Sequence, residues 1–283
     1  MMAATIDELI ALVEQNRDAV VGDLFPVREA APRLIEASVY HPVICLILQG
    51  SKETTSHAGS VRLGRGDMLV VSHDTPVTAR ITGVPYLALI LPIDLERVRT
   101  LEQSLTSADA GQAASVLQAT VAGSAILETL ARLLAIRPKT PEDSVLTPLL
   151  LTELHFHLLR SPAGAMLRRL VSPSSHESRI ARVAALIRRD YARVHRLADL
   201  AREAGMGQSA FHHHFKAVTG TTPLQFQKDI RLSEALRLLE QGAVSVTEAG
   251  LSVGYESPAQ FSRDFSRRFG RPPRRVLQGI AAE

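Results

Sequence analysis

The chain has 283 residues, enough for two domains, with a formal net charge of +3 and 46% hydrophobic residues. Cys45 is the single cysteine, which excludes an intramolecular disulfide and is typical of a reducing compartment. No segment reaches the roughly 20 apolar residues of a membrane span, and residues 1–16 carry acids where a signal peptide needs an apolar core, so we expect a cytoplasmic protein without membrane contact.

The charge is unevenly divided along the chain. Residues 1–172 hold 15 Lys and Arg against 18 Asp and Glu, whereas residues 173–283 hold 17 against 11. A basic half beside an acidic half is expected where only one half meets phosphate groups. The excess is small, so charge supports a nucleic-acid partner only together with other signals.

The first half predicts a short helix followed by strands. Residues 7–20 have the spacing of an amphipathic helix, which indicates an N-terminal arm over residues 1–20. Short apolar segments bounded by Gly, Pro, Asp or Ser then recur at residues 39–48, 61–63, 68–71, 77–81 and 86–91. Strands of this length and spacing favour a β-sandwich or barrel. The turn at residues 64–67, together with the strand after it, resembles the inter-strand turn of cupin barrels.

Many cupins are metalloenzymes, so an enzyme has to be weighed. Their metal site needs two histidines one residue apart, a carboxylate and a later histidine. The histidines of the predicted barrel are isolated from one another, and they are His41, His57 and His73. His155 and His157 are one residue apart, but in a helical stretch that spacing puts them on different faces. We therefore predict no metal, no cofactor and no catalytic residues.

Cys45 lies inside an apolar strand and leaves two interpretations open. It can be a small buried hydrophobic residue. It can also be a thiol that senses electrophiles or oxidants, which requires a basic neighbour. No basic residue adjoins it in sequence, although folding could bring one.

Residues 95–171 switch to helical periodicity. Residues 116–136 and 145–159 predict two apolar helices separated by prolines, and these helices must be buried against the barrel or a second subunit. Residues 172–177 are polar and contain proline, which indicates a linker. Ser178 is the expected N-cap of the next helix.

The last hundred residues contain one pattern twice. Gly205 returns as Gly254 at an offset of 49. At an offset of 50, Phe211, Phe215, Gly220 and Pro223 return as Phe261, Phe265, Gly270 and Pro273. Each copy predicts a short helix, a glycine turn and a second helix, at residues 197–218 and 246–269. Two copies are too few for a solenoid, so the choice lies between two helix-turn-helix units and two amphipathic hairpins of an ordinary helical domain.

The outward faces of the second helices carry hydrogen-bond donors, which favours DNA binding over the ordinary helical domain. In the first copy these residues are Gln208, Ser209, His212, His213 and Lys216; in the second they are Gln260, Ser262, Arg263 and Arg267. Arg can pair with guanine and Gln with adenine. His212, His213 and His214 cannot chelate a metal together, because successive helical residues diverge, and a solvated or DNA-facing surface is expected. Asp264 is expected to turn away from phosphate.

Residues 178–280 resemble the DNA-binding domain of the AraC/XylS family of bacterial transcription regulators, most specifically over residues 254–263 and 269–273. The resemblance implies seven helices, with residues 223–239 as a linker helix that holds two recognition helices in successive major grooves about 34 Å apart. Residues 25–160 resemble the N-terminal domain of a subgroup of that family, through residues 46–52 and 85–89.

The resemblance implies which side chains read DNA. The base-contacting residues are Ser209, His212, His213, Gln260, Ser262 and Arg263. The phosphate-contacting residues are Lys216, Ser257 and Arg267. Two departures from the family's pattern matter. Gly250 replaces an alanine, which should weaken its helix by up to about 1 kcal/mol, and His212 and His213 replace larger donors.

The combined expectation is an α+β chain with an N-terminal cupin-like β-barrel and packed helices at residues 21–171, and a C-terminal all-α domain with two helix-turn-helix motifs at residues 178–283. We expect a sequence-specific transcription regulator that binds promoter DNA, contacts RNA polymerase and forms a homodimer, and activation is the mode that the resemblance implies. Its barrel would sense a small-molecule effector, at residues that the sequence does not assign. Two alternatives stay open: a ligand-independent regulator whose barrel only dimerises, and a cupin-type enzyme fused to a DNA-binding domain.

Overall fold

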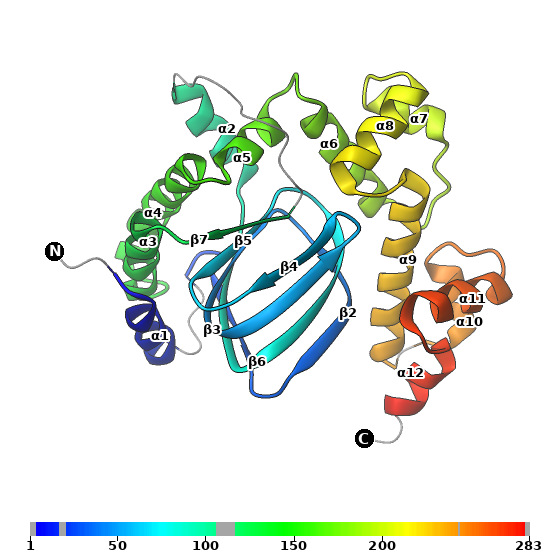
Figure 1. The fold of residues 1–283 in the computed structure, drawn as a ribbon, viewed down its shortest axis with the longest axis horizontal. Coiled ribbons are helices and arrows are strands. Elements are labelled where there is room, and N and C mark those ends of the chain that lie inside the picture. The colour runs from blue at the N-terminus through cyan, green and yellow to red at the C-terminus, as the bar shows by residue number, and fades with distance from the viewer. Residues whose placement is uncertain (1–3, 17–20, 106–116, 243, 281–283) are drawn as a thin grey trace.

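The structure is a computed structural model that describes residues 4–16, 21–105, 117–242 and 244–280. A bent antiparallel sheet with helices on its outer face is followed by an all-helical C-terminal part that lies beside the sheet (Figure 1). The fold class expected from the sequence is confirmed.

Two long strands, β3 (Val43–Ser56) and β6 (Thr75–Pro92), pair antiparallel along most of their length and organise the sheet. Shorter strands pair with one half of each. The first half of β3 binds β5 (Asp67–Val71), and its second half binds β4 (Gly59–Leu63). The first half of β6 binds β2 (Arg33–Tyr40), and its second half binds β1 (Phe25–Glu29). Among the described strands the paired path β1-β6-β3-β5-β7 is open, so the sheet is barrel-like rather than closed.

The sheet bends where Gly50 of β3 meets Gly83 of β6. A Cβ atom on Gly50 would lie 2.2 Å from the carbonyl oxygen of Gly83, so no larger residue fits this crossing. The β3–β6 register also shifts between residues 47 and 52, which marks a bulge. The bend gives the sheet an inner and an outer face, and each has its own buried cluster.

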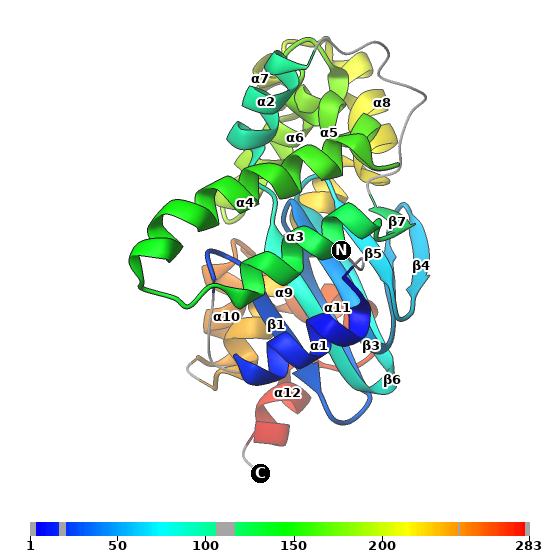
Figure 2. The same ribbon diagram turned by 90° about the vertical axis from the view of Figure 1, so that its left-hand side faces the viewer.

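Helices cover the outer face of the sheet. They are α1 (Ile6–Gln15), α2 (Leu95–Ser104), α3 (Ser124–Ala135), α4 (Pro141–Arg160) and α5 (Gly164–Val171). Figure 2 shows α1, α3 and α4 in front of the strands. Their apolar faces meet alternate strand residues such as Leu46, Leu48 and Met68 in one core. The burial therefore follows the helical and strand periods of the sequence.

Several predicted elements need correction. The strand predicted at residues 39–48 is the end of β2 and the start of β3, and residues 77–81 and 86–91 belong to one long strand, β6. The helix predicted over residues 116–136 is wrong at its start, because Leu117–Val121 forms β7 and pairs with β5. Pairing with a sheet edge overrides local helical spacing there. Of the predicted N-terminal helix, residues 17–20 lie outside the described residues.

Seven helices are described after residue 175, the number that the resemblance implies. They are α6 (His176–Arg189), α7 (Leu197–Glu203), α8 (Gln208–Thr219), α9 (Pro223–Glu240), α10 (Val246–Ser252), α11 (Pro258–Phe269) and α12 (Pro273–Ile280). The expected cap at Ser178 is wrong: Ser175 caps α6, because its Oγ accepts the Ser178 backbone N–H. The predicted linker at residues 172–177 therefore overlaps the first turn of α6.

Each helix-turn-helix unit is built around a left-handed glycine and buried phenylalanines. Gly205 has φ +63° between α7 and α8, and Gly254 has φ +88° between α10 and α11. Phe211 and Phe261 are fully buried in the first and second unit, respectively. The predicted turns and the inward phenylalanine faces are confirmed.

Gly250 has a packing role that helix propensity alone does not reveal. It is buried in α10, and an added Cβ would lie 2.9 Å from Cδ1 of Phe261. The missing side chain lets α11 pack closely against α10.

We predict that Gly250→Ala lowers the free energy of unfolding by about 1 kcal/mol in urea denaturation. Alanine gains up to about 1 kcal/mol of helix propensity but loses about 1–3 kcal/mol by overpacking against Phe261. In a Phe261→Leu background the same alanine should instead stabilise the protein. A stabilising effect in both backgrounds would show that the Phe261 ring does not limit this position.

Candidate nucleic-acid interface

The first candidate recognition surface lies on α8. Ser209, His212, His213 and Lys216 are all exposed, as the predicted outward face requires. His214 is not part of that surface, which corrects the expectation for the histidine run. Its ring is partly buried and stacks on His176 of α6, with 3.8 Å between ring centroids.

The second candidate surface lies on α11. Gln260 and Arg263 are exposed, and Ser262 is half-buried. Ser257 is the N-cap of α11, and its Oγ accepts the backbone N–H of Gln260 at 3.4 Å. Arg267 has a side chain 71% exposed and donates from Nη2 to Asp264 Oδ1 at 2.6 Å. Gln260, Arg263 and Arg267 recur at three- and four-residue spacing and share one exposed face of α11, whereas the half-buried Ser262 lies off that face.

Asp264 turns inward, so its charge does not confront a bound phosphate. The residue is buried, and its carboxylate lies 2.7 Å from Lys228 Nζ. It also accepts a hydrogen bond from the Tyr255 hydroxyl at 3.4 Å. The contact with Lys228 joins α11 to α9.

Arg231 fixes the two helix-turn-helix units relative to each other. It donates to the backbone oxygens of Tyr191, Ala192 and Arg193, just ahead of the first unit, at 2.7 to 3.1 Å. It also donates to the Gly254 oxygen, in the turn of the second unit, at 3.0 Å. The 18 residues of α9 span about 27 Å at the rise of an α-helix, which suits units that read successive grooves.

Three polar contacts dock the C-terminal helices on the sheet. Arg188 of α6 donates to Asp74 at 2.8 Å, and His57 lies 2.6 Å from Asp229 of α9. Arg271 donates to Glu36 of β2 at 2.5 Å. Burial disfavours the charged form of Asp74, but hydrogen bonds from His41 and Arg188 outweigh burial and lower the pKa of that carboxyl. The junction therefore joins side chains of the sheet and of the C-terminal helices in defined pairs.

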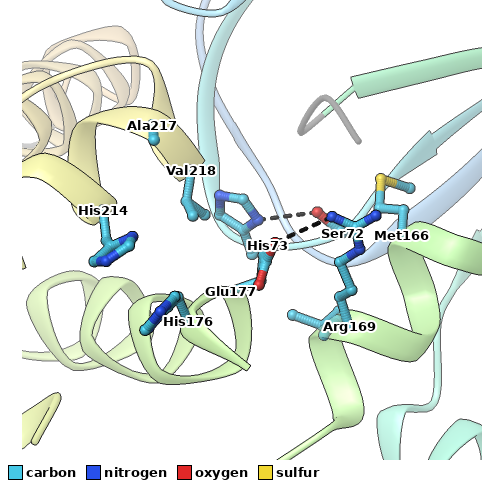
Figure 3. Close-up of a pocket in the computed structure, with 10 residues that line it drawn as sticks. Ser72, His73, Met166, Arg169, His176, Glu177, His214, Ala217 and Val218 are labelled. Carbon is cyan, nitrogen blue, oxygen red and sulfur yellow. Dashed lines mark hydrogen bonds and ion pairs between the residues drawn. The ribbon is translucent and has the colours of Figure 1, made fainter. Parts of the chain in front are cut away.

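A small cavity of about 200 Å³ lies at this junction, between the sheet and helices α5, α6 and α8 (Figure 3). His73 is buried beside it, with Nδ1 2.9 Å from Ser72 Oγ. Nε2 of His73 has no hydrogen-bond partner among the described residues. Desolvation lowers the pKa of His73 to about 4, so the ring is neutral at pH 7.

A larger cavity of about 490 Å³ lies against the inner face of the bent sheet. Its walls are mostly apolar and come from β1, β2, β3 and β6. Lys52 is buried there, and its Nζ donates to Cys45 Sγ at 3.2 Å and Tyr40 Oη at 3.3 Å. The basic neighbour of Cys45 that the sequence did not show is therefore supplied by the fold. Sequence reasoning missed Lys52, Asp74 and Arg231 as organising residues.

Family comparisons agree with this architecture. Residues 21–166 match the family described as AraC-type transcriptional regulator N-terminus, and residues 200–279 match a helix-turn-helix domain. The chain belongs to the AraC-type transcriptional regulators. The family resemblance expected from the sequence is confirmed over both halves of the chain.

Two curated relatives of this AraC-type chain are bacterial regulators. The virulence regulon transcriptional activator VirF of Yersinia enterocolitica is 30% identical over 150 residues, 52% of this chain and 54% of VirF. The regulator ExsA of Pseudomonas aeruginosa is 29% identical over 119 residues, 42% of each chain. The chain thus spans about half the length of the curated relatives it matches.

Solved structures show the same fold. Apo ToxT of Vibrio cholerae aligns with a TM-score of 0.59 at 13% identity, over 90% of this chain and 95% of ToxT. ToxT with a bound unsaturated fatty acid aligns with a TM-score of 0.58 at the same identity, over 90% of this chain and 93% of ToxT. At this identity the likeness concerns the fold alone.

No three His, Cys, Asp or Glu side chains in the described part of the chain gather into a group that could hold a metal ion. Among the helices described, none has the length and apolar character to cross a membrane.

We predict that the free energy of unfolding falls by about 2 kcal/mol between pH 7 and pH 5 because of His73. The folded pKa lies below the ordinary value of 6.5, so the unfolded state gains a proton first as pH falls from about 6.5 to about 4. Urea denaturation at the two pH values measures the effect. His73→Gln should lose about 2 kcal/mol of that pH dependence, and an equal dependence in both proteins would contradict the assignment.

Proposed function

We propose that the chain is a sequence-specific DNA-binding transcription activator whose N-terminal sheet senses a small molecule. The observation that carries the proposal is the pair of helix-turn-helix units with exposed donors on α8 and α11, joined rigidly by α9. Residues 21–171 would form the sensing and dimerisation domain, and residues 178–283 the DNA-binding domain. Promoter DNA and RNA polymerase are the proposed partners, in the cytoplasm.

The proposed division of labour on DNA follows side-chain chemistry. Ser209, His212 and His213 of α8, and Gln260, Ser262 and Arg263 of α11, would contact base edges. Lys216, Ser257 and Arg267 would contact phosphates, which supplies affinity and salt dependence but no sequence information. Ser257 Oγ already accepts the backbone N–H of Gln260. Its own hydroxyl would therefore contact a phosphate by donating its O–H to a phosphate oxygen.

The proposed small-molecule sensing rests on the cavity of about 490 Å³, a volume within the range of small-molecule sites. The fatty acid bound to ToxT, which shares this fold, supports the same assignment. VirF, a named transcriptional activator, supports activation as the mode.

Strand β2 offers a route from the cavity to the DNA-binding domain. Val39 of β2 lines the cavity and also packs against the buried core around Phe211 and Phe215 of the first unit. Glu36 of the same strand pairs with Arg271. A ligand that moves β2 would therefore change how both units are held, which is the physical requirement for ligand control.

A ligand-independent regulator that only dimerises is the second candidate. The exposed apolar residues of α4 favour a homodimer, because Val145 is 60% and Leu149 62% exposed. The homodimer fits both candidates, whereas the cavity on the inner face of the sheet favours the first. The proposal assigns no catalytic activity.

We predict that Arg263→Ala weakens binding to the specific promoter site by about 1–3 kcal/mol and relaxes specificity at one base position. Lys216→Ala should weaken binding to all sequences alike and reduce the salt slope by about 1. Fluorescence anisotropy with specific and random DNA at two salt concentrations separates the two effects. Arg99→Ala, on the outer helix α2, is the matched control and should change neither. Equal losses on specific and random DNA for both variants would refute the assigned base readers.

A further inference from the structure

Lys52 places a positive charge in an apolar cavity. Its side chain enters from β3, and the whole residue is only 5% exposed. Cys45 Sγ and Tyr40 Oη are its hydrogen-bond acceptors, and the Tyr40 ring centroid lies 5.2 Å from Nζ. Among the residues that the structure describes, no carboxylate lies within 4.0 Å of Nζ.

This arrangement leaves the ammonium short of a counter-ion. An ammonium has three N–H donors, and the recorded contacts use two of them. A buried charge without an opposite charge is costly, whereas an added anion at the same place is strongly favoured. Burial alone would lower the pKa of Lys52, but interactions with Cys45, Tyr40 and Tyr86 outweigh burial and raise it.

The rest of the cavity has the opposite character. Beyond the polar end the lining is hydrocarbon, including Ile35, Val39, Ile81 and Ile90. Tyr86 lines the cavity near Lys52 and adds a second phenol hydroxyl beside that of Tyr40. One polar, cationic end and one long apolar wall match an amphipathic anion.

We propose that this cavity binds a monocarboxylate with a hydrocarbon body, with the carboxylate on Lys52 Nζ and the body along β1, β2 and β6. The hydroxyls of Tyr40 and Tyr86 donate to the second carboxylate oxygen. The contacts in the cavity support the binding site by themselves. That the bound acid is the effector of transcription rests on the proposed function.

A thiolate at Cys45 is the competing counter-ion, because its sulfur is 3.2 Å from Nζ. A Cys45–Lys52 ion pair would neutralise the charge but would occupy only one end of the cavity. It would leave the apolar space of about 490 Å³ without an occupant. A carboxylate ligand satisfies the ammonium and fills that space, so we favour it.

Isothermal titration of the 283-residue chain with dodecanoate and dodecan-1-ol, below their aggregation limits, tests the site directly. Dodecanoate should bind about 10- to 100-fold more tightly than the alcohol, because a hydrogen bond between charged groups is worth about 1.5–3 kcal/mol. Lys52→Met should abolish that preference. Lys52→Met should also remain folded, because it replaces a buried charge with an apolar chain of similar length. Tyr40→Phe, which keeps the packing, should weaken only the acid, by about fivefold.

The controls separate the ligand classes and the rival counter-ion. A second acid, 4-phenylbutanoate, replaces the alkyl body of dodecanoate with an aryl body. Tight binding of either dodecanoate or 4-phenylbutanoate supports the proposal. Cys45→Ser should retain the preference for acid. No acid preference in the wild-type protein, an acid preference that survives Lys52→Met, or loss of acid binding in Cys45→Ser would each overturn it.

A parallel DNA titration distinguishes this inference from the proposed function. Tight acid binding by a protein that fails to bind DNA would sustain the cavity assignment and contradict the regulator. Specific DNA binding with no acid preference would sustain the regulator and contradict the cavity assignment.

Discussion

The structure depends most on the position of β2 between two environments. One side of this strand closes the apolar cavity, and the other packs against the DNA-binding helices. Val39 takes part in both, because it lines the cavity and contacts the core of the first helix-turn-helix unit. Packed interiors shift between discrete arrangements rather than deforming smoothly, so a change at one side of β2 must be accommodated at the other.

Charged and polar pairs hold the C-terminal helices against the sheet around this strand. The sheet contributes Asp74 and Glu36 to bonds with arginines of the helical domain, while His57 meets the buried Asp229. The two arginine pairs follow the acidic and basic division of the sequence, whereas the His57–Asp229 pair reverses it. The exposed donors of α8 and α11 therefore stay available for nucleic acid, and Arg231 holds the two units in one arrangement.

Local rules predicted the repeated unit, the phenylalanine core and the exposed recognition faces, because each depends on spacing within one helix pair. Local rules could not predict that Lys52 points to the inner face of the sheet. Alternation places Cys45 and Ile47 on the inner face, so Lys52 should point outward, but the register shifts between residues 47 and 52 reverse the faces. Pairing with β5 similarly turned Leu117–Val121 into a strand. Arg231 organises backbone oxygens from distant loops, which no local pattern reveals.

The central claim is that the N-terminal sheet controls the DNA-binding helices through their docking on β2 and on the turn between β3 and β4. The most direct test measures the Kd for specific promoter DNA of the wild-type chain and of Glu36→Gln/His57→Ala, which alters only the sheet side of two contacts. The account predicts a change in Kd of at least about fivefold, the lower range of allosteric coupling. An unchanged Kd, with the variant folded, would show that docking on the sheet does not restrain DNA binding.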